Sequence, residues 1–167
     1  MIRYFAYGSN MLTGRLRERV PSAELLGAAR LGGFSQTLTK RSLDGSGKAA
    51  IRQDDRSSVL GVLFRVAAED LDGLFAAESV GYHPVRHLDV RLLSGPRLLD
   101  CWSFVGIEDY LVPGLAPYDW YLDLMVAGAV EHGLPERHVE TLRSAASVQD
   151  PDPQRPTRLA AIGVLSA

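Results

Sequence analysis

Hydrophobic and polar positions along the chain predict strands in its first two thirds and helices in its last third. Apolar runs or alternating segments that end at glycine or polar turns are typical of strands. Such segments lie at residues 2–7, 23–31, 34–39, 59–66, 87–93 and 98–105. Leu88, Val90 and Leu92 fall on one side of their segment, and Gly95-Pro96 follows it as a turn. The last two segments are therefore predicted to form a hairpin.

A clear helical repeat of hydrophobic residues follows residue 67. Leu71, Leu74 and Phe75 repeat at helical intervals in a helix that opens at residues 68–70 and ends near Glu78. Other helices are predicted by capping residues and stop signals. They cover a short segment ending near Arg19 and residues 118–131 and 135–144.

The remaining segments are polar or rich in glycine and proline. Residues 40–48 are expected to be an exposed loop, and residues 106–117 a long connection. Three prolines after residue 150 predict an irregular tail over about 145–167, in which 159–165 is also compatible with a short strand. We expect a single domain over residues 1–167, because two domains would each lie near the lower size limit.

Strands followed by helices indicate an α+β fold, since alternating β and α units would be expected of a parallel sheet. The architecture that fits is a small mixed or antiparallel β-barrel with flanking helices. Hydrophobic residues make up 46% of the chain and charged residues 23%, which is typical of a globular protein with a real core.

Composition also limits the kinds of partner and the cellular location that we expect for the chain. The net charge of −2 does not favour a nucleic-acid partner. Cys101 is the single cysteine, so no internal disulfide is implied and it is expected to be a buried small side chain. No segment approaches the ~20 apolar residues of a membrane span, and the N-terminus does not resemble a signal peptide. We therefore expect no membrane partner and a cytoplasmic location.

The most informative local pattern is Tyr7-Gly8-Ser9-Asn10, where a strand ends at glycine before a short helix. Consecutive backbone N–H groups in such a turn can hold an anion, and a carboxylate or phosphate would be the natural guest. On these residues alone, a plain turn in which Ser9 and Asn10 cap the helix is an equally open interpretation.

Three segments, in order, resemble the γ-glutamyl cyclotransferase-like family. The first is Tyr4 to Met11 with its YGSN motif, and the second is Leu71 to Glu78, which is similar to the family's "LDxL…E" helix. The third begins at Pro117 and contains Tyr121, Gly128-Ala129 and Gly133-Leu134-Pro135. These landmarks lie between residues 4 and 135, and the resemblance implies the family's small β-barrel with flanking helices.

The resemblance also implies a reaction. The free α-amine of a γ-glutamyl group attacks its own γ-carbonyl, forming 5-oxoproline and releasing an amine or amino acid. Glu78 would be the catalytic general acid and base, in a semi-apolar pocket that raises its pKa. Tyr7, Gly8, Ser9, Asn10 and Tyr121 would bind substrate. Without the resemblance, the residues favour a solvated glutamate at a helix end for Glu78, and the two tyrosines could be core residues.

Several points stay open in the sequence. Many relatives have glycine after the glutamate, where this chain has Ser79, and the loop from there to Arg86 is altered, so the leaving group is undefined. A member of the same fold that only binds a small carboxylate metabolite, or a hydrolase, is the alternative. The four histidines lack zinc spacing and no nucleotide motif is present, so neither metal nor cofactor is expected. The partner is a small γ-glutamyl substrate, and the oligomeric state is monomer or homodimer.

Overall fold

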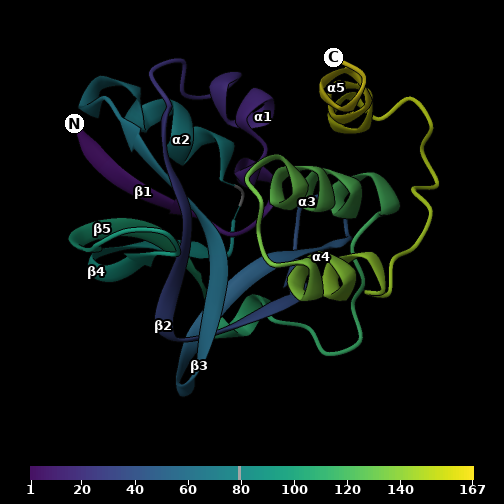
Figure 1. The fold of residues 1–167 in the computed structure, drawn as a ribbon. Helices are drawn as coiled ribbons and strands as arrows, with labels where there is room; N and C mark the ends of the chain where they lie inside the picture. The colour runs from purple at the N-terminus through teal and green to yellow at the C-terminus, as the bar shows by residue number, and fades with distance from the viewer. Residues whose placement is uncertain (79) are drawn as a thin grey trace.

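Five strands close into a barrel in the order β1-β3-β2-β4-β5, with helices packed around it (Figure 1). The computed structural model describes residues 1–78 and 80–167. The strands are β1 (Ile2–Ala6), β2 (Glu24–Arg41), β3 (Gly47–Val66), β4 (Tyr82–Leu92) and β5 (Arg97–Gly106). The helices are α1 (Thr13–Arg17), α2 (Leu71–Ala77), α3 (Asp119–Glu131), α4 (Glu136–Arg143) and α5 (Pro156–Leu165). Short 3₁₀ turns are η1 (Ser9–Met11), η2 (Ala68–Asp70) and η3 (Glu108–Tyr110).

The barrel is mixed, as the sequence predicts. Neighbouring strands pair antiparallel, except that β1 closes the barrel against β5 in parallel, with Arg3 opposite Cys101 and Tyr4 opposite Trp102. β2 and β3 are long enough to bend around the barrel as one hairpin. The η1 turn that follows β1 contacts β3 on one side and α1 and α3 on the other, so it lies between the barrel and the helices.

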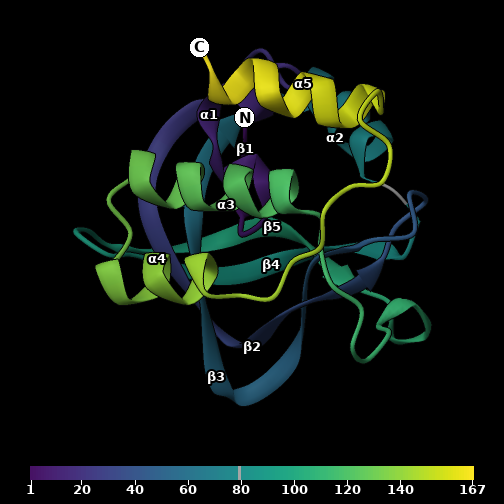
Figure 2. The same cartoon turned by 90° about the vertical axis from the view of Figure 1, so that its right-hand side faces the viewer.

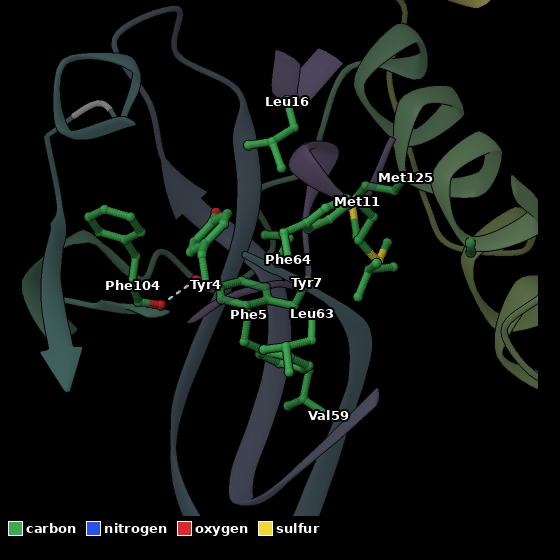
Figure 3. Packing of buried hydrophobic residues seen from close by; sticks show 14 of the residues in the cluster. Tyr4, Phe5, Tyr7, Met11, Leu16, Val59, Leu63, Phe64, Phe104 and Met125 are labelled. Carbon is green, nitrogen blue, oxygen red and sulfur yellow. Dashed lines mark hydrogen bonds between the residues drawn. The ribbon is translucent and has the colours of Figure 1, made fainter. Parts of the chain in front are cut away.

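The core joins the barrel to the helical side (Figure 3). The side chains of Phe5, Leu63 and Phe64 come from the barrel strands and belong to this core, and Met11 packs there against Met125 of α3. These apolar side chains are fully buried, as expected for the large residues that dominate burial energy. The segment that carries the YGSN motif is therefore fixed by packing on both sides.

Most predicted elements are confirmed. The helix ending at Glu78, the 118–131 and 135–144 helices and the hairpin after residue 87 are all present, with small differences at their ends. Leu88 and Val90 are buried, and so is Cys101 in β5. Ser79, which follows Glu78, lies outside the described residues.

Two predictions about the first hairpin are wrong. The segments 23–31 and 34–39 are one strand, β2, because Gly33 at φ +80° forms a bulge that lets the strand continue. Residues 40–48 are not simply an exposed loop, since the turn is confined to 42–46. Lys40 and Ser46 are buried within it, while Leu43 is exposed.

The expected irregular tail also contains a helix. Residues 156–165 form α5, which packs against α1 and α3 (Figure 2), so neither an irregular segment nor a last strand is present there. Pro156 stands at the first helical position, where its missing N–H costs nothing and its fixed φ suits the helix. Read as a helix breaker, this proline led to the wrong prediction.

Candidate active site

A cavity of about 230 Å³ opens where the YGSN loop, the end of α2 and the β2–β3 turn meet. All the residues that the sequence singled out for the site line it, together with several that it did not. The lining includes Tyr4, Tyr7, Gly8, Ser9, Asn10, Arg15, Arg19, Asp44, Lys48, Glu78, Tyr82, Phe104, Trp120 and Tyr121. The fold thus brings Glu78 and the motif, 68 residues apart, to one place.

Glu78 points toward the motif and not into bulk solvent. Its Oε1 accepts a hydrogen bond of 3.1 Å from the Asn10 side-chain amide. The same amide nitrogen donates to the Tyr4 hydroxyl at 3.0 Å, and the Arg19 guanidinium donates to Asn10 Oδ1 at 2.8 Å. Asn10 is therefore oriented from both ends, and it holds one oxygen of the carboxylate in place. α2 ends at Ala77, which leaves Glu78 as the first non-helical residue, facing the cavity.

Burial raises the pKa of the Glu78 carboxyl above its ordinary value. The positive charges of Arg19 and Lys40 and the hydrogen bond from Asn10 oppose this effect. Lys40 is buried in turn, and burial lowers the pKa of its amine to about 8. Its Nζ donates to the Val80 carbonyl at 3.0 Å and lies 4.0 Å from the centre of the Tyr82 ring. Burial and the neighbouring positive charges therefore act in opposite directions on the pKa of Glu78, and burial is the larger effect.

The YGSN loop is held close to α3 and to the barrel. Gly128 in α3 lets the helix approach the loop, because a Cβ there would lie 2.5 Å from the Leu12 nitrogen. A Cβ at Gly8 would lie 3.0 Å from the Tyr121 hydroxyl. Ser9 and Asn10 are both buried, although they are polar. The loop is therefore a cavity wall. The alternative in which Ser9 and Asn10 cap a helix is wrong, because neither η1 nor α1 begins with a side-chain cap hydrogen bond.

Tyr7 and Tyr121 combine the two roles left open for them. Each ring is buried in the core, and each also lines the cavity. The Tyr7 hydroxyl donates to the Phe104 carbonyl at 2.6 Å (Figure 3). The Tyr121 hydroxyl accepts from the Ala49 N–H at 3.1 Å, and burial raises its pKa to about 12. Both hydroxyls are thus neutral hydrogen-bonding groups at physiological pH.

The other end of the cavity carries a lysine–aspartate pair. Lys48 Nζ lies 2.8 Å from Asp44 and within about 5 Å of the ring centres of Trp120 and Tyr121. Both charged side chains are largely buried. Since Asp44 balances Lys48, this end is polar but nearly neutral.

Sequence reasoning missed several charged and aromatic site residues, among them Tyr4, Arg15, Arg19 and Lys48 in the cavity wall. It also missed Lys40, whose charge acts on Glu78. Arg15 and Arg19 are four residues apart, and this helical spacing directly after the motif was the available signal. Lys40 and Lys48 gave no signal, because they flank a turn that reads as exposed. Arg86, at the end of the altered loop, is exposed, and its guanidinium lies 3.9 Å from the centre of the Trp102 ring.

Comparisons with known proteins identify the family of this chain. A model of the AIG2-like family matches residues 58–142. Human γ-glutamylcyclotransferase is 34% identical over 149 residues, which cover 84% of this chain and 77% of that protein. The chain belongs to the γ-glutamylcyclotransferase family. The resemblance read from the three sequence segments is confirmed, and so is the expected activity: the chain is a cyclotransferase of this kind.

Solved structures extend the match to the whole fold. A γ-glutamyl cyclotransferase structure aligns with a TM-score of 0.81 and 26% identity, covering 97% of this chain and 98% of that one. The crystal structure of a human protein aligns with a TM-score of 0.83 and 28% identity over the same shares of the two chains. Within the described part of the chain, no helix is long and apolar enough to cross a bilayer.

Proposed function

We propose that Glu78 carries the proton in a 5-oxoproline-forming reaction on a γ-glutamyl substrate. The substrate's α-ammonium must lose a proton before its nitrogen can attack the γ-carbonyl. The departing nitrogen must gain a proton as its bond to that carbon breaks. One carboxylate can do both in turn, so the proton removed from the nucleophile is returned to the leaving group. Ring closure is intramolecular, and no cofactor is needed to assemble the reactants.

The observation that carries this proposal is the position of Glu78 in the cavity, with one oxygen held by Asn10. A raised pKa suits a general base and acid, because proton transfer is most efficient when the pKa lies near the working pH. With Oε1 fixed by Asn10, the second carboxylate oxygen is the one that would face the substrate nitrogen. Arg19 and Lys40 would keep the carboxylate ionised enough to act first as a base.

The backbone of Gly8, Ser9 and Asn10 is proposed to hold the substrate's α-carboxylate. Turns of this kind present N–H groups to an anion. This position would place the α-ammonium, one carbon away from the carboxylate, beside Glu78. Tyr7 and Tyr121 would shape the pocket and offer neutral hydroxyl groups near the substrate.

Replacement of Glu78 by Gln tests the proposal. The side chain keeps its size and can still pair with Asn10, but it can no longer accept a proton. We expect kcat for 5-oxoproline release to fall by about 10² to 10⁴-fold, with no loss of thermal stability, because a buried carboxyl group has been neutralised. Asp72→Asn removes an exposed acid from the same helix and serves as the matched control.

The product is identified by mass spectrometry. Full activity in the Glu78→Gln variant would show that another group moves the proton. Release of glutamate in place of 5-oxoproline by the wild type would assign the site to water activation instead.

A further inference from the structure

The Tyr4 hydroxyl is a buried polar group that lies beside Glu78 in the cavity. Tyr4 is 5% exposed and lines the cavity wall. Its hydroxyl oxygen lies 3.0 Å from the side-chain nitrogen of Asn10, and the same nitrogen lies 3.1 Å from Glu78 Oε1. The hydroxyl and the carboxylate are therefore neighbours on one amide group.

The direction of the Asn10 amide is set by Arg19. A guanidinium can only donate hydrogen bonds, so the Asn10 atom that lies 2.8 Å from Arg19 must be the carbonyl oxygen, Oδ1. The amide nitrogen is then on the other side, where its two hydrogens go to Glu78 and to Tyr4. Because an amide nitrogen also only donates, the Tyr4 oxygen is the acceptor in this bond.

The O–H of Tyr4 must then point elsewhere. Across residues 1–78 and 80–167, the bond from Asn10 is the one hydrogen bond of this hydroxyl, so its proton has no acceptor in the described chain. Burial raises the pKa of Tyr4 well above its ordinary value, so the hydroxyl keeps this proton at physiological pH. A buried O–H without an acceptor, in the wall of a cavity, is a donor available to a ligand.

Two other tyrosines of the cavity wall differ in this respect. The Tyr7 hydroxyl donates to the Phe104 carbonyl at 2.6 Å, and the Tyr82 hydroxyl donates to the Ala49 carbonyl at 2.5 Å. Their protons are used inside the protein, so toward a ligand these hydroxyls can only accept. Tyr4 keeps its proton for the cavity, and its ring is held edge-to-face against Phe104 with 6.2 Å between the ring centres.

A γ-glutamyl substrate offers few acceptors at this end of the cavity. Its α-ammonium and the N–H of the bond to be broken are donors, so they do not pair with the Tyr4 O–H. The α-carboxylate is assigned to the Gly8–Asn10 backbone, which leaves the γ-carbonyl oxygen. This oxygen becomes an oxyanion when the nitrogen attacks, and a donor fixed beside it stabilises the charge as it develops.

We propose that Tyr4 is a catalytic residue that donates its hydroxyl hydrogen bond to the γ-carbonyl oxygen and to the oxyanion formed from it. In the first step the C–N bond of the new ring forms, and the carbonyl electron pair moves to the oxygen, which Tyr4 stabilises without giving up its proton. In the second step the pair returns and the bond to the leaving nitrogen breaks. The proton that Glu78 took from the nucleophile goes to that nitrogen. This inference rests on the proposed function, because it takes Glu78 as the proton carrier.

Tyr4→Phe tests the inference, since it removes only the hydroxyl and keeps the ring that packs on Phe104. With γ-glutamyl-L-alanine, kcat for 5-oxoproline release should fall by about 10²- to 10³-fold, the loss typical of removing one oxyanion donor. KM should stay within about 3-fold of wild type, because the lost bond is strongest in the transition state. Tyr110→Phe, at a partly buried tyrosine outside the cavity lining, is the control that should change neither value.

The pH profile separates this role from an effect through Glu78. A neutral donor to the substrate should leave the acidic limb of kcat/KM unmoved. If Tyr4 instead stabilised ionised Glu78, its loss would raise the pKa of Glu78 and move that limb to higher pH, which would overturn the inference. A rise in KM at unchanged kcat would assign Tyr4 to the α-carboxylate and would also overturn it.

Replacement of Tyr4 by 3-fluorotyrosine distinguishes hydrogen bonding from packing. This side chain keeps the ring and the hydroxyl, and the fluorine makes the hydroxyl a stronger donor. Its kcat should therefore stay within about 3-fold of wild type. A loss of about 10²-fold with 3-fluorotyrosine would show that the packing of the ring matters and not its proton, and this arm does not depend on the folding of Tyr4→Phe.

Failure of the proposed function has a different signature. Wild-type protein would then form no 5-oxoproline from γ-glutamyl-L-alanine, or Glu78→Gln would remain active on it. If instead the wild type is active, Glu78→Gln is inactive and Tyr4→Phe keeps its kcat, only the role of Tyr4 is wrong.

Discussion

Replacement of Lys40 by Met should make the protein more stable and shift the pH dependence of its activity. Lys40 is fully buried, and its pKa of about 8 replaces an ordinary value of 10.5. Holding this amine protonated at pH 7 therefore costs the folded state about 3 kcal/mol. Met fills similar space without a charge.

The gain is smaller than that cost, because Met also loses the favourable contacts of the Lys40 amine. The hydrogen bond from Lys40 to the Val80 carbonyl is worth about 1 kcal/mol, and the position over the Tyr82 ring is worth a similar amount. We expect a net stabilisation of about 1–2 kcal/mol at pH 7, measured by urea denaturation. Arg41→Met, which removes an exposed charge from the same strand, is the control.

The sign of the pH dependence is fixed by the lowered pKa. Between pH 8 and 10.5 the unfolded chain keeps the Lys40 proton that the folded chain has already released, so wild-type stability rises with pH in that window. The advantage of Lys40→Met should therefore be largest below pH 8 and disappear toward pH 10.5. An advantage that is constant across this range would contradict the assigned cause.

The same substitution removes a positive charge that stabilises ionised Glu78. The pKa of Glu78 should then rise further, and the acidic limb of kcat/KM should move to higher pH. A less stable Lys40→Met variant with an unmoved acidic limb would show that Lys40 is a packing residue with no electrostatic effect on Glu78.

Two other predictions concern the frame around the cavity. Gly47→Ala should destabilise the fold by about 3 kcal/mol, because the added Cβ would lie 2.1 Å from the Leu38 carbonyl oxygen. Gly163→Ala is the control, because its added Cβ would have nothing within 4 Å, and it should stabilise the fold by about 0.5–1 kcal/mol. Differential scanning calorimetry measures the stability of both variants. An equal effect of the two substitutions would refute the steric cause. Arg155 holds the pKa of buried Asp150 well below its usual range, so Asp150 stabilises the fold above pH 4 and loses this effect as pH falls. Asp150→Asn should lower the midpoint of thermal unfolding at pH 7 and flatten its acid dependence, and an unchanged acid dependence would contradict the assignment.

The sequence predicted the elements that follow local rules. The hairpin after residue 87 and the helix that ends at Glu78 have clear periodicity and turn residues, and both are present. β2 and α5 were misread because Gly33 and Pro156 are normally breakers. In a bent barrel strand, however, glycine permits a bulge, and at the first helical position proline is favourable. The meaning of each depends on tertiary context, which local patterns do not contain.

The candidate site likewise contains some residues that the sequence could predict and others that it could not. The motif and Glu78 could be found because the family's landmarks occur in order, and the barrel brings them within one hydrogen bond. Lys40 and Lys48 could not be recognised as site residues, since a lysine beside a polar turn is usually solvated, and for Arg15 the four-residue spacing to Arg19 was the one available signal. Their burial results from closure of β2 and β3 over the cavity and from the packing of α5 on α1.

Lys40 also connects the segment after Glu78 with the β2–β3 hairpin. It donates to the Val80 carbonyl, two residues after Glu78. It also belongs to the β2–β3 hairpin, whose turn supplies Asp44 and Lys48 to the opposite end of the cavity. A change in the Ser79–Arg86 segment would therefore alter the partners of a buried charge, and with it the acidity of Glu78. The segment that follows Glu78 is thus connected to the Glu78 carboxylate through Lys40, which bonds to the one and acts by its charge on the other.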